Sequence, residues 1–257
     1  MTQITNFRAL LETAIAQSSR LPRLADYDVV YFLGDFTGTF ASRAGQIVRA
    51  LDNFGGVIIG NPGEQKALRI AQSLGLEGPV NLPRYGDFLA APPSGALVID
   101  FNDKPAGRLF GQKLRAAGVA VYDHLYALHE LDLTHTYLTV RDERKAVIER
   151  LDEYLALFDL FSDELSQQTL LARMLALIGL DLTPLLNVAF PYGVFTADSR
   201  SSHSLVIRED EVFVDVGAAH GDTVAEFFNS ARGKSATIHA FEPDSVNFRA
   251  LDALCRL

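Results

Sequence analysis

The sequence predicts an α/β protein in which two parallel sheets are joined by a helical segment. Short runs rich in Val and Ile alternate with amphipathic helical patterns between residues 26 and 130. This alternation stops over 131–205 and resumes over 206–257. Apolar runs separated by helices are typical of parallel strands buried on both faces. We therefore expect an N-terminal helix over 1–25, a Rossmann-like α/β domain over 26–130, a helical connector and approach segment over 131–205, and a partial second α/β domain over 206–257.

Composition limits the classes of protein to which the chain can belong. Hydrophobic residues make up 48% of its 257 residues, which is enough for a packed core. The formal net charge of −9 argues against a nucleic-acid partner, because affinity for phosphate backbones comes mainly from Lys and Arg. The N-terminus lacks a basic leader followed by a long apolar core, and no stretch reaches the roughly 20 apolar residues that span a bilayer. With Cys255 as its single cysteine, the chain is expected to be soluble and cytoplasmic, with no membrane partner.

The first half of the chain is predicted to alternate between helices and strands. Apolar side chains at helical spacing, among them Phe7, Leu11 and Ile15, predict a helix over residues 4–19. Continuous apolar runs predict strands over 27–35, 55–61, 95–101 and 119–128, and amphipathic patterns predict helices over 41–54, 63–75 and 105–118. Together these elements predict a small doubly wound sheet with helices on both faces.

The connector is predicted to contain two amphipathic helices, over 141–161 and 162–180. Ser162 is a suitable N-cap for the second helix, with Asp163 and Glu164 near its positive end. Acidic residues are frequent on the polar sides of these helices, so we expect their apolar faces to pack between the two sheets rather than against a membrane. The loop at 199–204 is expected to be an exposed connection, with a lid over a ligand as the alternative.

The stretch EVFVDVGAAHGDTVAEFF, residues 211–228, predicts a strand, a short glycine-containing loop and a helix. Gly217 and Gly221 allow a tight turn and a close backbone approach to a ligand, although many loops contain two glycines only to turn. A dinucleotide fingerprint G-x-G-x-x-G would place its second glycine at Ala219 and a pyrophosphate at the helix start. Asp222 stands at that helix start and Asp215 ends the strand, so an anionic phosphate is disfavoured. A ligand with a cationic sulfonium and an ammonium group, such as S-adenosylmethionine, fits better than NAD.

A further candidate carboxylate, Glu242, lies downstream of the glycine-containing loop. The strand in TIHAFEPD ends at Glu242, about 20 residues past Gly221, where an acidic side chain can accept both hydroxyls of a ribose. Pro243 ends the strand, and Asp244 is expected to cap the next helix. We interpret Glu242 as a ligand-binding residue, because a lone carboxylate otherwise has little reason to end an apolar strand.

These residues resemble the opening motifs of the FkbM-type S-adenosylmethionine-dependent methyltransferases, with the pattern D-x-G-x-x-x-G-D-T followed by F-E-P. Asp215, Gly217, Gly221, Asp222, Thr223 and Glu242 all fall in register with it. The resemblance implies that the second domain is the first half of a Rossmann-like class I methyltransferase sheet. It also implies S-adenosylmethionine as cofactor, bound at Asp215, Gly217, Ala218, His220, Gly221, Asp222, Thr223 and Glu242. Within the loop, His220 is expected to contribute backbone and shape rather than proton transfer, so no catalytic base is named.

The function implied by the resemblance is methyl transfer, mostly to a hydroxyl of a sugar, glycan or natural product. The specific part of the match covers only 211–250. The second α/β region holds two strands and two helices, and a sheet of two parallel strands cannot cover its own edges. We therefore expect further strands or a partner, such as a second copy in a homo-oligomer, to complete it, and expect the 257-residue chain to be a poor methyltransferase by itself.

Other residues allow other functions. Gly34 and Gly38, with Thr37 and Thr39 as donors, could hold the phosphate of a nucleotide or nucleotide-sugar, although Asp35 opposes this and a simple turn explains the glycines equally well. The alternative function is therefore a non-catalytic nucleotide-binding scaffold. An NAD(P)-linked oxidoreductase is disfavoured by Ala219 and Asp222. His124, His129 and His135 lack carboxylates at metal-ligand spacing, so no metal is expected.

Overall fold

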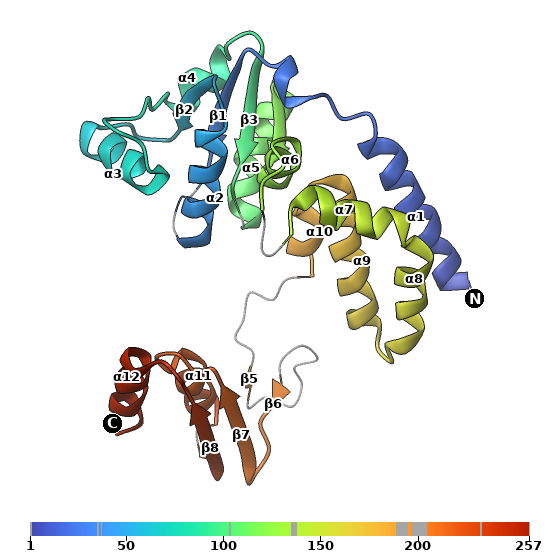
Figure 1. The fold of residues 1–257 in the computed structure, drawn as a ribbon, viewed down its shortest axis with the longest axis vertical. Coiled ribbons are helices and arrows are strands. Elements are labelled where there is room, and N and C mark those ends of the chain that lie inside the picture. Colours follow the sequence, from blue (N-terminus) through green and yellow to red (C-terminus); the bar gives the residue numbers. More distant parts are fainter. Residues whose placement is uncertain are drawn as a thin grey trace. The chain divides into compact units, whose positions relative to one another are not determined.

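The computed structural model describes residues 2–34, 36, 38–102, 104–134, 138–188, 195–196, 205–231 and 233–256. The chain divides into two compact units, Met1–Val188 and Ala189–Leu257 (Figure 1). The strands and helices of the first unit are α1 (Thr2–Ser18), η1 (Leu24–Asp26), β1 (Val29–Leu33), α2 (Gly38–Arg49), β2 (Phe54–Ile58), α3 (Glu64–Leu74), α4 (Tyr85–Ala90), β3 (Ala96–Asp100), α5 (Pro105–Ala116), β4 (Ala120–Asp123), α6 (His124–Glu130), α7 (Val140–Glu149), α8 (Leu151–Ala156), η2 (Leu157–Leu160), α9 (Glu164–Gly179) and α10 (Thr183–Leu186). Those of the second are β5 (Phe195–Thr196), β6 (Leu205–Val206), β7 (Glu211–Val216), α11 (Asp222–Ser230), β8 (Ala236–Phe241) and α12 (Ser245–Cys255).

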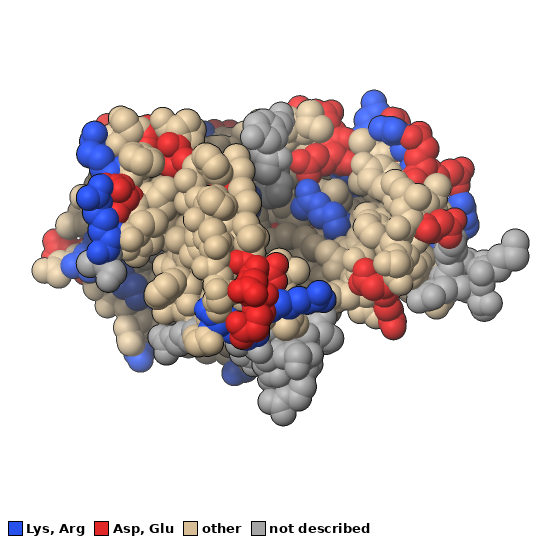
Figure 2. Space-filling model, turned by 90° about the horizontal axis from the view of Figure 1, so that it is seen from below, with Lys and Arg blue, Asp and Glu red and all other residues tan. Residues whose placement is uncertain are grey.

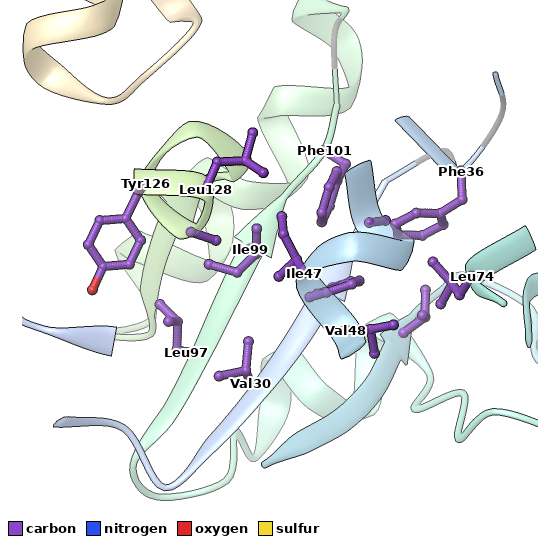
Figure 3. Close-up of a cluster of buried hydrophobic side chains, with 14 of the residues drawn as sticks. Val30, Phe36, Ile47, Val48, Leu74, Leu97, Ile99, Phe101, Tyr126 and Leu128 are labelled. Carbon is purple, nitrogen blue, oxygen red and sulfur yellow. The ribbon is translucent and has the colours of Figure 1, made fainter. Parts of the chain in front are cut away.

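The first unit contains the predicted doubly wound sheet. Its four strands are parallel and lie in the order β2-β1-β3-β4. Val30 and Phe32 of β1 face one core with α2 and α6, shown in Figure 3, while Leu33 faces the other core with α4 and α5. Because alternate residues of a strand point to opposite faces, both sides of β1 are buried, which explains why its sequence is continuously apolar.

The predicted strand over 119–128 was too long. β4 ends at Asp123, whose side chain accepts a hydrogen bond from the backbone N–H of Leu125 and so caps α6. Residues His124 to Leu128 of α6 are all buried, so the helix lacks the polar face that would have separated it from a buried strand. The short helix α4 was not predicted.

The helical connector also differs in detail. The helix predicted over 141–161 is interrupted at Arg150 into α7, α8 and the 3-10 turn η2. The N-cap of α9 is Asp163 rather than Ser162, since the Asp163 carboxylate accepts the backbone N–H of Ser166 at 2.7 Å. The apolar faces of these helices, expected to lie between two sheets, pack against one another and against α1, with Leu11 and Phe158 fully buried.

The second unit also alternates strands and helices, and it is smaller than the first. β7 and β8 are parallel, with Val216 paired to Phe241 at their carboxyl ends. On the helix side, the Phe213 ring stacks on Phe227 of α11 with centroids 4.6 Å apart. On the opposite face, Val214 and Val216 are 54% and 81% exposed, so the sheet buries one of its faces only. The loop at 199–204 lies outside the described residues.

The surface carries charge of both signs. In the view of Figure 2, acidic and basic side chains are interspersed with broad uncharged areas. Within the described part of the chain, no helix is both long enough and apolar enough to cross a bilayer.

Candidate functional site

The candidate site is the loop Gly217–Gly221, here called the glycine loop, which joins β7 to α11. The backbone N–H groups of Gly217 and Ala218 both donate to the carbonyl oxygen of Phe241, at 2.8 and 3.0 Å. The loop is therefore fastened to the end of the neighbouring strand β8. As a result, the structure gathers the predicted residues at the carboxyl ends of two adjacent parallel strands, where open α/β sheets bind their ligands.

The glycine loop contains a cluster of left-handed backbone conformations. Gly217, Ala219 and Gly221 have φ angles of 89°, 44° and 90°. Glycine adopts such angles freely, whereas for Ala219 the conformation costs about 1–2 kcal/mol. Ala219 takes the position of the glycine that a dinucleotide fingerprint would carry, so here alanine adopts a glycine-like conformation. Such strain persists only where neighbouring contacts hold it.

The two glycines of the loop have different surroundings. A Cβ atom added to Gly217 would meet no heavy atom within 4 Å, so this side of the backbone is open. A Cβ added to Gly221 would lie 2.6 Å from Leu254 Cδ2 and 2.9 Å from Leu251 Cδ1. Gly221 therefore allows α11 to pack against α12, and Gly217 is the glycine that leaves space for a ligand.

Glu242 has a structural role that the sequence did not reveal. Its Oε2 accepts the backbone N–H of Ala219 at 2.8 Å, and its Oε1 accepts the N–H of Asp244 at 2.8 Å. We expected this carboxylate to have no structural role at the end of its strand. That prediction was wrong, because the carboxylate supports Ala219, the strained residue of the glycine loop. An ionised carboxylate offers about four acceptor positions, so both oxygens retain capacity for ligand hydroxyls.

Asp215 is the penultimate residue of β7 and brings a second carboxylate to the site. Its Oδ2 atom is buried and has no hydrogen-bond partner among the described residues. A buried polar atom without a partner costs about 1–3 kcal/mol, and such atoms are few in native structures. Asp215 therefore has an unused acceptor close to the glycine loop.

The remaining predicted residues take different positions. Ala218 is 3% exposed and packs with Val224 and Leu251, so its side chain belongs to the core rather than to a ligand surface. His220 and Asp222 are exposed. Asp222 is the first residue of α11 but not its cap, because the N-cap is Gly221 and no side chain caps the helix. Thr223 is half-buried in the first turn of α11.

Charge around the loop is acidic. Asp215, Asp222 and Glu242 make no ion pair with any of the described residues. Asp244 caps α12 as predicted, accepting the N–H groups of Val246 and Asn247 at 2.9 Å each. In the described ranges, no group of three or more His, Cys, Asp and Glu side chains is arranged to hold a metal.

A solved structure with a similar fold is the crystal structure of methyltransferase FkbM from Methylobacillus flagellatus KT. The two structures superpose with a TM-score of 0.68 at 16% sequence identity, over 98% of this chain and 69% of that one. The sequence matches no protein-family model and no curated protein. At this identity the match establishes the fold: the chain has the α/β, Rossmann-like architecture found in that methyltransferase.

Proposed function

We propose that the protein is an S-adenosylmethionine-dependent methyltransferase of the FkbM type, with its cofactor at the glycine loop. The observation that carries this proposal is the placement of Glu242. Its carboxylate lies against Ala219 of the loop, at the end of the strand next to β7. A carboxylate in this position can accept both hydroxyl groups of a ribose, while the open side of Gly217 admits the ligand to the backbone.

The acidic character of the loop favours this cofactor over a dinucleotide. Two like charges about 4 Å apart repel by about 1 kcal/mol in water and by several times that in a sheltered site. A pyrophosphate at the start of α11 would meet Asp222 in this way. The sulfonium and ammonium groups of S-adenosylmethionine would instead be attracted to Asp215 and Asp222.

Bound S-adenosylmethionine would supply an electrophilic methyl group. In the proposed reaction, the residues of this chain bind and orient the cofactor through Glu242 and the loop backbone. Orientation of two bound reactants supplies much of the rate of a transfer between them. The proposed acceptor is a hydroxyl of a sugar, glycan or natural product, and the proposed compartment is the reducing cytoplasm, in line with the unpaired Cys255.

Calorimetric titration of the 257-residue chain with S-adenosylmethionine, S-adenosylhomocysteine and NAD tests the proposal. We expect both adenosyl ligands to bind at one site per chain and to compete with each other, and we expect NAD not to displace them. Binding of NAD at the glycine loop, or absence of binding by both adenosyl ligands at millimolar concentration, would overturn the proposed function.

A further inference from the structure

A second candidate site lies in the first unit, at the carboxyl edge of its four-stranded sheet. A pocket of about 510 Å³ is formed there by the ends of β1 and β2, by one face of α3 and by residues that follow β3. We refer to it as the α3 pocket. Its volume lies within the range of about 300–1,000 Å³ that is usual for small-molecule sites.

The strand order explains why a pocket occurs at this place. From β1 the chain moves to β2 on one side and then crosses to β3 on the other side. Loops that leave a sheet in opposite directions open a crevice at the carboxyl ends of the strands, and open α/β sheets bind ligands there. Gly34 and Asn102, which follow β1 and β3, both line the pocket. A Cβ added to Gly34 would lie 3.0 Å from the backbone nitrogen of Asn102, so the two loops approach closely.

One wall of the α3 pocket is aromatic and held in place. The rings of Tyr85 and Phe110 meet edge to face, with centroids 5.1 Å apart. The Tyr85 hydroxyl donates to the carbonyl oxygen of Phe110 at 2.9 Å. This bond engages the hydroxyl of the tyrosine with the protein's own backbone, which leaves ring surface as the lining of the pocket. A fixed aromatic wall suits a ligand with a planar or otherwise apolar body.

A second part of the pocket lining is basic. Lys66, Arg69 and Ser73 line the pocket from α3, and their spacing places them on one face of that helix. Lys66 and Arg69 form no ion pair with a described residue. In contrast, Arg108 and Arg173 of the same unit each pair with a carboxylate. Two unpaired cations beside a hydroxyl are therefore available in a chain whose formal net charge is −9.

We propose that the α3 pocket binds a nucleoside phosphate, with the base or sugar against the Tyr85–Phe110 wall and the phosphate at Lys66 and Arg69. This inference is independent of the proposed methyl transfer, since the glycine loop is acidic and attracts a cationic ligand. It also differs from the sequence hypothesis, which placed a phosphate at Thr37 and Thr39. Thr37 and the side chain of Thr39 lie outside the described residues, and Lys66 and Arg69 had no part in that hypothesis.

The test is titration of the full chain with ADP, GDP, UDP and CDP, with the matching nucleosides and with inorganic phosphate. We expect at least one diphosphate to bind at least tenfold more tightly than both its nucleoside and phosphate. The double variant Lys66→Gln, Arg69→Gln should weaken that binding tenfold or more. The matched control Lys113→Gln removes an exposed cation of α5 that does not line the pocket, and it should change nothing.

Glu242→Ala separates this proposal from the proposed function. If the α3 pocket is the site, this variant should bind the diphosphate with unchanged affinity. The proposal is overturned if none of the four diphosphates binds at millimolar concentration. It is equally overturned if binding is insensitive to the Lys66 and Arg69 double variant, or if inorganic phosphate binds as tightly as every diphosphate. Circular dichroism of the double variant checks that it is folded, which is expected because both side chains are exposed.

Discussion

Glu242 fixes the shape of the glycine loop before any ligand arrives. One of its carboxylate oxygens accepts the N–H of Ala219 and the other accepts the N–H of Asp244. The two bonds hold the side chain in one orientation, with its remaining lone pairs free for a ribose. A group that is already ordered loses less entropy when it binds, so the same contacts that support the loop also favour affinity.

Substitution of Asp222 shows whether the acidic residues near the loop act on the ligand through their charge or only shape the loop. Asp222 is exposed and caps no helix, so Asp222→Asn removes its charge and leaves the N-cap at Gly221 intact. Exposed charge pairs contribute about 0.2–1 kcal/mol. We expect the affinity for S-adenosylmethionine to fall roughly two- to fivefold and the affinity for neutral adenosine to stay nearly unchanged, as measured by calorimetry. An equal loss for both ligands would show that the charge of Asp222 does not select the cation.

Asp123 is expected to control the acid stability of the first unit. Burial opposes its ionisation, but nearby His124 and Arg108 outweigh burial and hold the pKa of the carboxyl well below its usual range. A group whose pKa is depressed in the folded state adds stability above its unfolded pKa of about 3.9, and this stability is lost as the pH falls toward the folded pKa. Burial raises the pKa of neighbouring Asp100, which has the opposite effect on stability.

Asp123→Asn should therefore cost about 3 kcal/mol at neutral pH, the lower end of the range for a broken buried pair, because buried Arg108 loses its nearest carboxylate and keeps only the ion pair with Asp181 at 3.6 Å. The difference in unfolding free energy between wild type and variant should shrink by about 1 kcal/mol between pH 6 and pH 3. Urea denaturation followed by circular dichroism measures both values. Asp100 is present in both proteins, so its contribution largely cancels. A difference that stays constant over this pH range would contradict the depressed pKa.

At the scale of single elements, α11 offers two adjacent phenylalanines with opposite environments. Phe227 is 2% exposed and stacks on Phe213 of β7, whereas Phe228 is 69% exposed. Truncation of a buried phenylalanine to alanine costs about 3–5 kcal/mol. Phe227→Ala should therefore unfold or strongly destabilise the second unit, while Phe228→Ala should change its stability by less than about 0.5 kcal/mol. Hydrogen exchange of the β7 amides reports the difference, and equal effects would mean that α11 packs differently.

Element types were predictable where apolar runs and helical patterns differ in period. The strands β1, β2 and β3 and the helices α2 and α3 were found in this way, since the strands form short apolar runs and these two helices each have a polar face, whereas the short helix α4 was missed. The boundary between β4 and α6 was missed because the buried residues of α6 continue the apolar run. The cap at Asp123 was the available signal, because an aspartate before a helical segment is a common helix start.

Contacts between distant residues could not be predicted from one sequence. The position of Glu242 after a strand was visible, but its bond to Ala219 depends on the register of β7 and β8. In contrast, the basic face of α3 could have been found, since Lys66 and Arg69 stand three residues apart in a predicted helix. The sequence alone did not show the pocket that this basic face lines.

At the scale of the whole molecule, the helices α7 to α10 of the predicted connector belong to the first unit, which ends at Val188. α1 packs with α8 and α9, and the Tyr126 hydroxyl donates to the carbonyl of Pro22 at 2.8 Å, which ties the N-terminal segment to α6. Few contacts cross a boundary between compact units, so a protease should cut near the division at Val188 and Ala189. We expect limited proteolysis to yield a stable fragment of residues 1–188, identified by mass spectrometry. Early cleavage between α1 and β1 would contradict this organisation.

Whether the glycine loop and Glu242 together bind S-adenosylmethionine can be measured with three proteins and one ligand. Calorimetry with S-adenosylhomocysteine compares the wild-type chain, Glu242→Ala and the control Asp244→Ala, which removes the cap of α12 but no proposed ligand contact. Hydrogen bonds to a charged group are worth about 1.5–3 kcal/mol. We expect roughly tenfold to hundredfold weaker binding for Glu242→Ala and little change for Asp244→Ala, with both variants folded by circular dichroism. Equal affinity of wild type and a folded Glu242→Ala variant would contradict this expectation.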